Sequence, residues 1–162
     1  MKKIASFIFI LSTTIALAQT GACSQFHRKN CSVDGGEKGV IWNYNAQSKS
    51  GLFNQGMTSK IRCVIYKGMD YRINVCCETA ALGDKINYKI FDARTNELLF
   101  DNATAENSPV FEFQSTATRQ LIIEVTVPKG ATETDKRKPI DAACVGLLIE
   151  NKVTAKQGFS QY

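Results

Sequence analysis

The stretch KIRCVIYKGMDYRINVCC, residues 60–77, decides the fold class. In its first half every second residue is apolar, namely Ile61, Cys63 and Ile65. In its second half the same spacing places four side chains on one face, namely Tyr71, Ile73, Val75 and Cys77. A period of two predicts two β-strands. A three-residue turn at 67–69 keeps both apolar faces on one side, so we expect a hairpin.

The pattern of short apolar strands continues along the chain. We expect a strand over 40–44, a second hairpin from 86–91 and 98–100, and further strands over 110–113, 121–127 and 144–149, with 45–56 as loop or short edge segments. No helical period persists beyond about two turns, and turn residues separate the strands. The sequence therefore predicts an all-β chain: one antiparallel, jelly-roll-like β-sandwich domain of about eight strands over 40–162, with little helix.

The first 18 residues have the features of a signal peptide. Lys2 and Lys3 precede an apolar stretch, and Ala16 and Ala18 provide small residues for cleavage before Gln19. A membrane anchor is disfavoured, because the stretch falls short of the ~20 apolar residues of a spanning helix. Lipidation at Cys23 is the other alternative. We therefore expect a secreted or periplasmic protein with no transmembrane segment after cleavage.

Net charge and cysteine content narrow the possible partners and the compartment of the protein. Loss of Lys2 and Lys3 with the signal lowers the formal net charge from +5 to +3, which does not favour nucleic acid as a partner. All six cysteines follow the cleavage site, which predicts disulfides in an oxidising compartment; the candidates are Cys23, Cys31, Cys63, Cys76, Cys77 and Cys144.

The spacing of the cysteines suggests a connectivity. Residues 19–39 form a polar, cysteine-bearing lead-in to which a Cys23–Cys31 bridge would give shape. Cys144 would then pair with Cys76 or Cys77, and Cys63 with what remains. A bridge between the neighbours Cys76 and Cys77 is disfavoured, because adjacent strand residues point to opposite faces.

Four segments carry a family resemblance: 66–73 (YKGMDYRI), 86–92, 97–102 and 121–127. Their order resembles that of the bacterial pre-peptidase C-terminal domain, a jelly-roll module of exported proteins. The resemblance covers about residues 56–150. It implies a binding or accessory role without a reaction, and for some members calcium binding. The six cysteines and the lack of an attached peptidase domain depart from the family pattern.

The chain lacks a recognisable catalytic group, so we name no catalytic residue. Its only histidine, His27, lies in the polar lead-in next to Arg28 and Lys29, where a solvent-exposed side chain is expected. Neither a G-x-S-x-G nucleophile turn nor a C-x-x-C redox motif is present. Glu112 and Glu124 take outward strand positions, where solvated side chains explain them.

Three groups of residues are candidates for binding. The aromatic residues Trp42, Tyr44 and Phe53 could form a ligand or partner surface, with core filling as the alternative. The basic residues Lys136, Arg137 and Lys138 could steer an acidic partner, with a solvated loop tip as the alternative. Asp92, Asp101 and Asn102 could offer oxygens to calcium, although such residues in turns usually bond their own backbone.

The function predicted from these features is that of a non-enzymatic, exported β-sandwich module. It would bind a protein, a glycan or an ion through loops at one end of the sandwich, with no cofactor other than calcium. The alternatives are an accessory or inhibitory subunit of a secreted enzyme, and a small secreted hydrolase or thiol oxidoreductase. The single histidine and the missing C-x-x-C motif count against the last of these.

Overall fold

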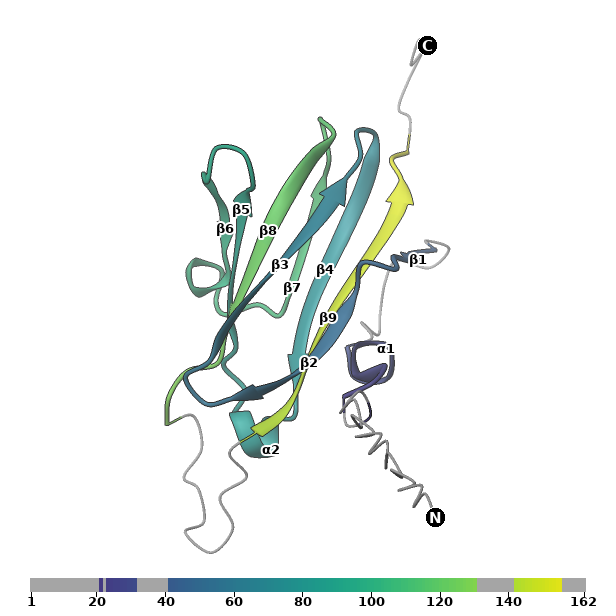
Figure 1. The fold of residues 1–162 in the computed structure, drawn as a ribbon. Helices are drawn as coiled ribbons and strands as arrows, with labels where there is room; N and C mark the ends of the chain where they lie inside the picture. Colours follow the sequence, from purple (N-terminus) through teal and green to yellow (C-terminus); the bar gives the residue numbers. More distant parts are fainter. Residues whose placement is uncertain (1–20, 22, 32–40, 131–141, 156–162) are drawn as a thin grey trace, which may run out of the picture.

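The computed structural model describes residues 21, 23–31, 41–130 and 142–155. Two antiparallel β-sheets face each other across one apolar core (Figure 1). No helix within these described ranges is long and apolar enough to cross a membrane. The predicted signal peptide, residues 1–18, lies outside them.

Nine strands of the described ranges build the sandwich. The first sheet contains β1 (Asn43–Tyr44), β2 (Lys49–Asn54), β4 (Met69–Cys77), β7 (Val110–Gln114) and β9 (Ala142–Val153). The second contains β3 (Thr58–Ile65), β5 (Asn87–Asp92), β6 (Leu98–Asp101) and β8 (Arg119–Thr126). Helical structure in the described chain is limited to α1 (Phe26–Asn30), α2 (Thr79–Leu82) and the 3₁₀ turn η1 (Asn102–Thr104).

The strand pairing is that of a jelly roll. β2 pairs with β9, β3 with β8, β4 with β7 and β5 with β6, so the pairs are nested like one long hairpin rolled up. Further pairing of β4 with β9 and of β5 with β8 joins these strand pairs into the two sheets. β1 and β2 lie along the same side of β9 and act as one interrupted edge strand. The predicted jelly-roll-like sandwich with little helix is confirmed.

The hairpin predicted over 60–77 is wrong in its pairing. Both strands exist, but β3 pairs with β8 and β4 pairs with β7 and β9, so the turn between them crosses from one sheet to the other. Gly68 takes a positive φ of 79° in this turn and donates its N–H to the Ser115 carbonyl. Alternation fixes which face of a strand is apolar, and both arrangements turn the same residues inward.

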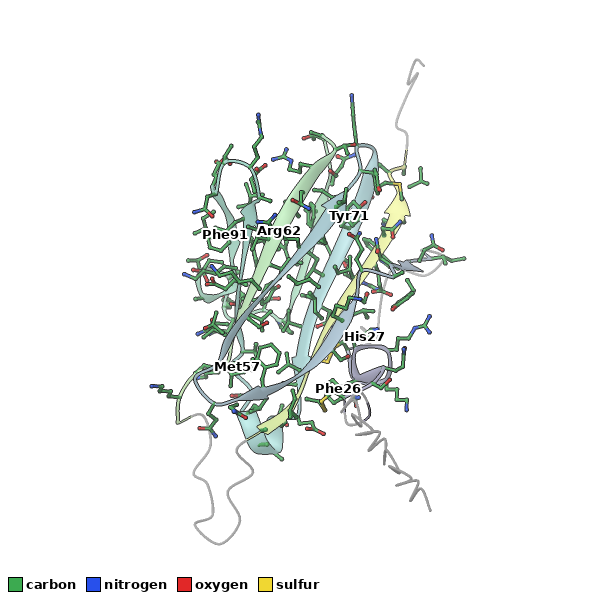
Figure 2. All side chains as sticks on the ribbon, viewed as in Figure 1. Phe26, His27, Met57, Arg62, Tyr71 and Phe91 are labelled. Atoms are coloured by element: carbon green, nitrogen blue, oxygen red, sulfur yellow. A yellow bond between two sulfur atoms is a disulfide. The ribbon has the colours of Figure 1, made fainter. Side chains whose placement is uncertain are left out.

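The core forms where these inward faces meet. Tyr71 and Ile73 of β4 belong to the same core cluster as Ile90, Leu121 and Ile123 of the second sheet, and all are almost completely buried. Tyr71 is labelled in Figure 2. On the opposite face of β4, Arg72 and Asn74 are also buried. Polar residues are rarely buried on the outer face of a sandwich unless something covers them.

The cover over β4 and β9 is the amino-terminal segment. α1 lies against the outside of the first sheet (Figure 1), where Cys23 is bonded to Cys144 of β9 and Cys31 to Cys76 of β4. The predicted Cys23–Cys31 bridge is therefore wrong, and so is the pairing of Cys144 with Cys76 or Cys77. Spacing along the chain could not show that both cysteines face a sheet built from distant strands. The predicted bridge from Cys63 is wrong as well, because this cysteine keeps a free thiol.

Gly146 makes this close approach possible. It lies directly opposite Cys76 in the β4–β9 ladder. A Cβ atom at this position would lie 2.5 Å from Cys31 Sγ and 2.8 Å from His27 Cα, well inside van der Waals contact. Only glycine leaves room for the backbone of α1 and for its disulfide above the sheet.

Candidate functional site

The outer face of the first sheet carries rows of polar side chains beyond the end of α1. Cross-strand partners place Gln114, Asp70 and Lys152 in one row. The next row contains Glu112, Arg72 and Glu150. Neighbouring strands lie about 4.8 Å apart, so the side chains within each row are in reach of one another.

Arg72 is the anchor of the second row. Its Nε donates to Glu150 Oε2 at 2.8 Å and its Nη2 lies 2.7 Å from the same oxygen, while Glu112 Oε1 lies 3.9 Å from Nη1. The arginine side chain is 7 % exposed, which makes the bond to Glu150 structurally necessary, because an unpaired buried charge is costly. Asn74, next along the face, donates to the Cys31 carbonyl and so ties α1 to the same strand.

Trp42 lies over this charged face. The Arg72 guanidinium carbon is 4.7 Å from the centre of its ring, and Lys152 Nζ is 4.6 Å from it. Cations at these distances are attracted to the electron-rich face of an indole. The two contacts hold a half-buried tryptophan in one place although it belongs to no strand.

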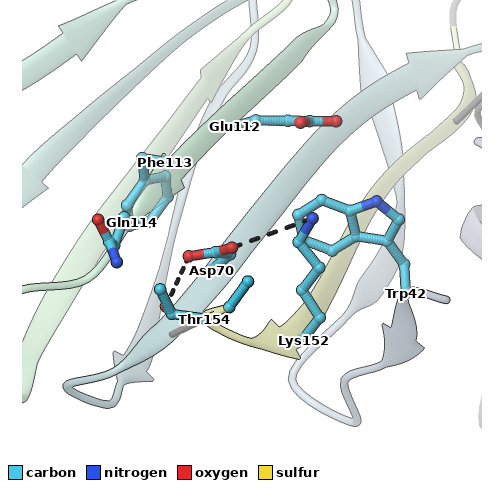
Figure 3. Close-up of a pocket in the computed structure, with 8 residues that line it drawn as sticks. Trp42, Asp70, Glu112, Phe113, Gln114, Lys152 and Thr154 are labelled. Carbon is cyan, nitrogen blue, oxygen red and sulfur yellow. Dashed lines mark hydrogen bonds and ion pairs between the residues drawn. The ribbon is translucent and has the colours of Figure 1, made fainter. Parts of the chain in front are cut away.

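Trp42 forms one wall of a pocket of about 600 Å³, shown in Figure 3. Most of its other walls are hydrogen-bonding side chains, namely Asp70, Glu112, Gln114, Lys152 and Thr154. Thr154 donates its hydroxyl to Asp70 Oδ1 at 2.6 Å, and Lys152 Nζ lies 4.0 Å from Asp70 Oδ2. The pocket combines the aromatic residues Trp42 and Phe113 with donors and acceptors of both charges.

His27 is buried, contrary to the solvent-exposed side chain predicted from its polar neighbours. It is 5 % exposed, with Nδ1 2.6 Å from Ser50 Oγ and Nε2 3.1 Å from the Tyr44 hydroxyl. Ser50 Oγ also accepts the His27 backbone N–H. We assign the Nε2–H tautomer, because Ser50 can then donate its own proton to Nδ1. The ring joins α1 to β1 and β2.

This environment makes folding sensitive to pH. Burial, and then the nearby charges of Arg28 and Lys49, lower the pKa of His27 below its ordinary value of 6.5. Below pH 6.5 the unfolded chain takes up a proton that the folded chain refuses, so the free energy of unfolding should fall as the pH decreases, by at most about 1.4 kcal/mol per pH unit. Above pH 6.5 both states are neutral and this effect disappears.

Urea unfolding between pH 7.5 and pH 5 measures the effect. His27→Gln keeps a polar side chain in the same place but does not titrate, so its stability should change less over this range than that of the natural chain. An equal slope in both proteins would show that other groups cause the pH dependence.

The predicted aromatic surface is divided between three environments. Phe53 is buried in the core, as the alternative reading expected. Tyr44 is 39 % exposed, stacks on His27 and has the Arg28 guanidinium 4.0 Å from its ring centre. Trp42 alone borders the polar pocket. Lys136, Arg137 and Lys138 lie outside the described residues.

The three candidate calcium ligands have local partners. Asp92 Oδ1 accepts the Arg94 and Thr95 backbone N–H groups, which, helped by nearby Arg119, hold the pKa of its carboxyl below the ordinary value. Asp101 Oδ2 forms an ion pair with Lys89 Nζ at 3.0 Å. Lys89 lies on β5, three residues before Asp92.

Asn102 is fully buried, accepting the Tyr88 N–H and donating to the Ile86 carbonyl. Among the described residues no three His, Cys, Asp or Glu side chains gather in a way that could hold a metal ion. Calcium at Asp92, Asp101 and Asn102 stays a prediction.

Two cysteines keep their thiols. Cys63 faces the core, where burial raises its pKa to about 11. Cys77 is half-buried and donates to the Gly83 carbonyl, and burial also raises its pKa. A thiol with a raised pKa is a poor nucleophile at neutral pH. Both cysteines therefore serve as packing residues.

Sequence reasoning missed most of the pocket. Asp70, Lys152 and Thr154 come from parts of the chain more than 80 residues apart, and the pairing of β4 with β9 brings them together. Outward positions on predicted strands were the only available signal, and such positions are usually solvated. Glu112 and Glu124 do face outward, and Glu124 pairs with Lys60 at 2.7 Å.

Comparison of the chain with protein-family models, curated proteins and solved structures finds no match. The resemblance to the pre-peptidase C-terminal domain therefore stays a prediction. What the structure itself provides is the jelly-roll topology, two disulfides and the pocket beside Trp42.

Proposed function

We propose that this chain is an exported, non-catalytic module that binds a glycan on the outer face of its first sheet, beside Trp42. The observation that carries the proposal is the composition of the pocket: one aromatic face held in place by Arg72 and Lys152, surrounded by carboxylate, amide, ammonium and hydroxyl groups. Sugars present an apolar face of C–H groups and a rim of hydroxyls, and an aromatic ring beside hydrogen-bonding groups complements both.

A glycan suits this pocket better than a protein or an ion. The centre of a protein interface is typically a dry, apolar pocket, whereas this one is lined mainly by polar side chains. A cation would need several oxygen ligands, but Asp70 already accepts from Thr154 and lies near Lys152. Export is supported by the two disulfides, which persist in oxidising compartments.

Trp42 offers a direct measurement, because it is the only tryptophan in the chain. Titration with soluble neutral and acidic polysaccharides should change its fluorescence for at least one of them. In affinity electrophoresis, Trp42→Ala should weaken binding of that polysaccharide at least about tenfold, or about 1.4 kcal/mol. The fluorescence change identifies the site, and the electrophoresis measures binding by the variant that lacks the tryptophan.

The matched control is Leu52→Ala. Leu52 is an exposed apolar residue at the far end of the same sheet, opposite Cys144, and its loss should leave binding unchanged. A panel of polysaccharides without any fluorescence response, or a Trp42→Ala variant that binds like the natural chain, would contradict the proposal.

A further inference from the structure

β7 is an edge strand of the first sheet and pairs only with β4 among the described strands. Two bonds fix the alternation of its backbone: Val75 N–H donates to the Pro109 carbonyl, and Ser115 N–H to the Met69 carbonyl. The backbone N–H and C=O groups of the odd-numbered residues of β7 therefore point toward β4. It follows that Glu112 points its N–H and C=O away from β4, toward the free edge.

The same register applies to Gln114 and Val110. Val110 is already bonded on both backbone groups to the Ser108 hydroxyl, which accepts its N–H and donates to its carbonyl. Glu112 and Gln114 thus form the accessible part of the edge. Between Val110 and Gln114 the strand contains neither lysine, proline nor bulge, which are three of the features that protect an edge against pairing.

An apolar cleft of about 150 Å³ opens between the sheets beside this edge. Phe111 and Phe113 of β7 line it together with Leu99 of β6, and Ile65, Ile90 and Leu121 lie among its other lining residues. A register shift between β5 and β6 lies next to Leu99, which is 40 % exposed. An apolar cavity of this volume accepts a benzene-sized group, which is the size of one leucine or phenylalanine side chain.

A strand added to β7 would use the edge and the cleft together. Its residue opposite Phe113 would point between the sheets, into the cleft, because side chains alternate along a strand. Its residue opposite Glu112 would lie on the outer face. The Glu112 carboxylate is 54 % exposed there and 3.9 Å from Arg72, whose charge is already used by Glu150. A basic side chain is therefore favoured opposite Glu112.

We propose that β7 binds an extended peptide segment of a partner protein as an added strand, with an apolar side chain in the cleft and a neighbouring basic side chain beside Glu112. Backbone bonds to Glu112 and Gln114 would provide affinity, and the cleft would select the sequence. This site adjoins the glycan pocket. Phe113 and Gln114 border both, and Glu112 lines the pocket and also lies on the edge, but Trp42 belongs only to the pocket and Leu99 only to the cleft.

The test is a selection of seven-residue peptides displayed on phage, carried out on the oxidised full-length chain. We expect enrichment of peptides with an apolar residue next to lysine or arginine. In fluorescence anisotropy with the synthetic forms of these peptides, Leu99→Arg should weaken binding at least about tenfold. Leu98→Arg is the matched control: Leu98 lies on the same strand and is 48 % exposed against 40 % for Leu99, but it does not line the cleft.

A second variant tests the backbone bonds. Gln114→Pro removes the N–H that faces the free edge and leaves the β4–β7 ladder intact, and edge strands tolerate proline at such positions. We expect it to weaken binding of the selected peptides about tenfold. If Leu99→Arg has a lower melting temperature than Leu98→Arg, Leu99→Ser serves as a milder variant of the cleft. Trp42→Ala should bind the peptides like the natural chain, so this result is independent of the glycan site.

Three results would overturn the inference. The first is that no peptide is enriched on the natural chain over Leu99→Arg. The second is equal binding of the selected peptides to Gln114→Pro, which would exclude an added strand. The third is concentration-dependent self-association in sedimentation that Leu99→Arg abolishes, because the occupant of the edge would then be a second copy of this chain.

Discussion

Replacing Cys23 and Cys144 together with alanine is expected to lower the free energy of unfolding by about 5 kcal/mol. The bridge joins residues separated by 121 positions, and in the chain-entropy model the cost of closing so long a loop in the unfolded state gives this value. The Cys31–Cys76 bridge closes a separation of 45, for which the same model gives about 4 kcal/mol. Either loss is a large part of a domain's usual 5 to 15 kcal/mol.

Urea unfolding of the double variants under non-reducing conditions measures these losses. Cys77→Ala is the matched control, because Cys77 adjoins Cys76 on β4 but keeps a free thiol; we expect a loss of about 1 kcal/mol or less. Alkylation of the denatured, unreduced natural chain should label only Cys63 and Cys77. Six labelled thiols, or a double variant as stable as the natural chain, would contradict the connectivity.

Gly146→Ala is expected to destabilise the protein by about 2 to 3 kcal/mol, although glycine within a strand is normally the less stable choice. The added methyl would lie 2.5 Å from Cys31 Sγ and 2.8 Å from His27 Cα. Neither atom can move freely, because one belongs to a disulfide and the other to the backbone of α1. The segment would have to lift from the sheet, so trypsin should cleave after the exposed Arg28 and Lys29 faster than in the natural chain.

The control for this variant is Gly51→Ala. Gly51 lies on the neighbouring strand β2, opposite Val145, and its added methyl would meet only one edge of the Phe53 ring, at 3.3 Å from Cε2. A ring can rotate slightly, so we expect a stability within about 1 kcal/mol of the natural chain. Similar losses in both variants would show that strand geometry, and not the docking of α1, determines the cost.

The period of two predicts the strands and their apolar faces correctly, but it does not predict which strands pair across long stretches of chain. The apolar faces of β3, β4, β5 and β8 follow from alternation alone, which was enough for a sandwich. Alternation could not predict the pairing partner of β3. The same residues are buried whether the turn after β3 stays within one sheet or crosses to the other. The segment 45–56 is predicted as loop or short edge segments, whereas β2 within it is a six-residue edge strand paired with β9.

The candidate site was predictable only in part. Trp42 was singled out for its residue type, and it does line the polar pocket. Arg72 and Asn74 alternate with the apolar residues of β4, a pattern typical of a solvated face, but they are buried because α1 and Trp42 cover them. His27 was misplaced for the same reason: local polarity suggests exposure, whereas two disulfides formed with strands far along the chain bring the residue to the sheet.

The nested order of the two disulfides has a consequence for biogenesis. In a chain exported from its amino end, as proposed here, Cys23 and Cys31, eight residues apart, reach the oxidising compartment before Cys144 does. Their most accessible partners at that stage are each other, and that bond excludes both native ones. We expect native yield to depend on thiol–disulfide exchange in the compartment where the protein matures. Oxidation of Cys144 would then mark a chain whose last strand is already in the sheet.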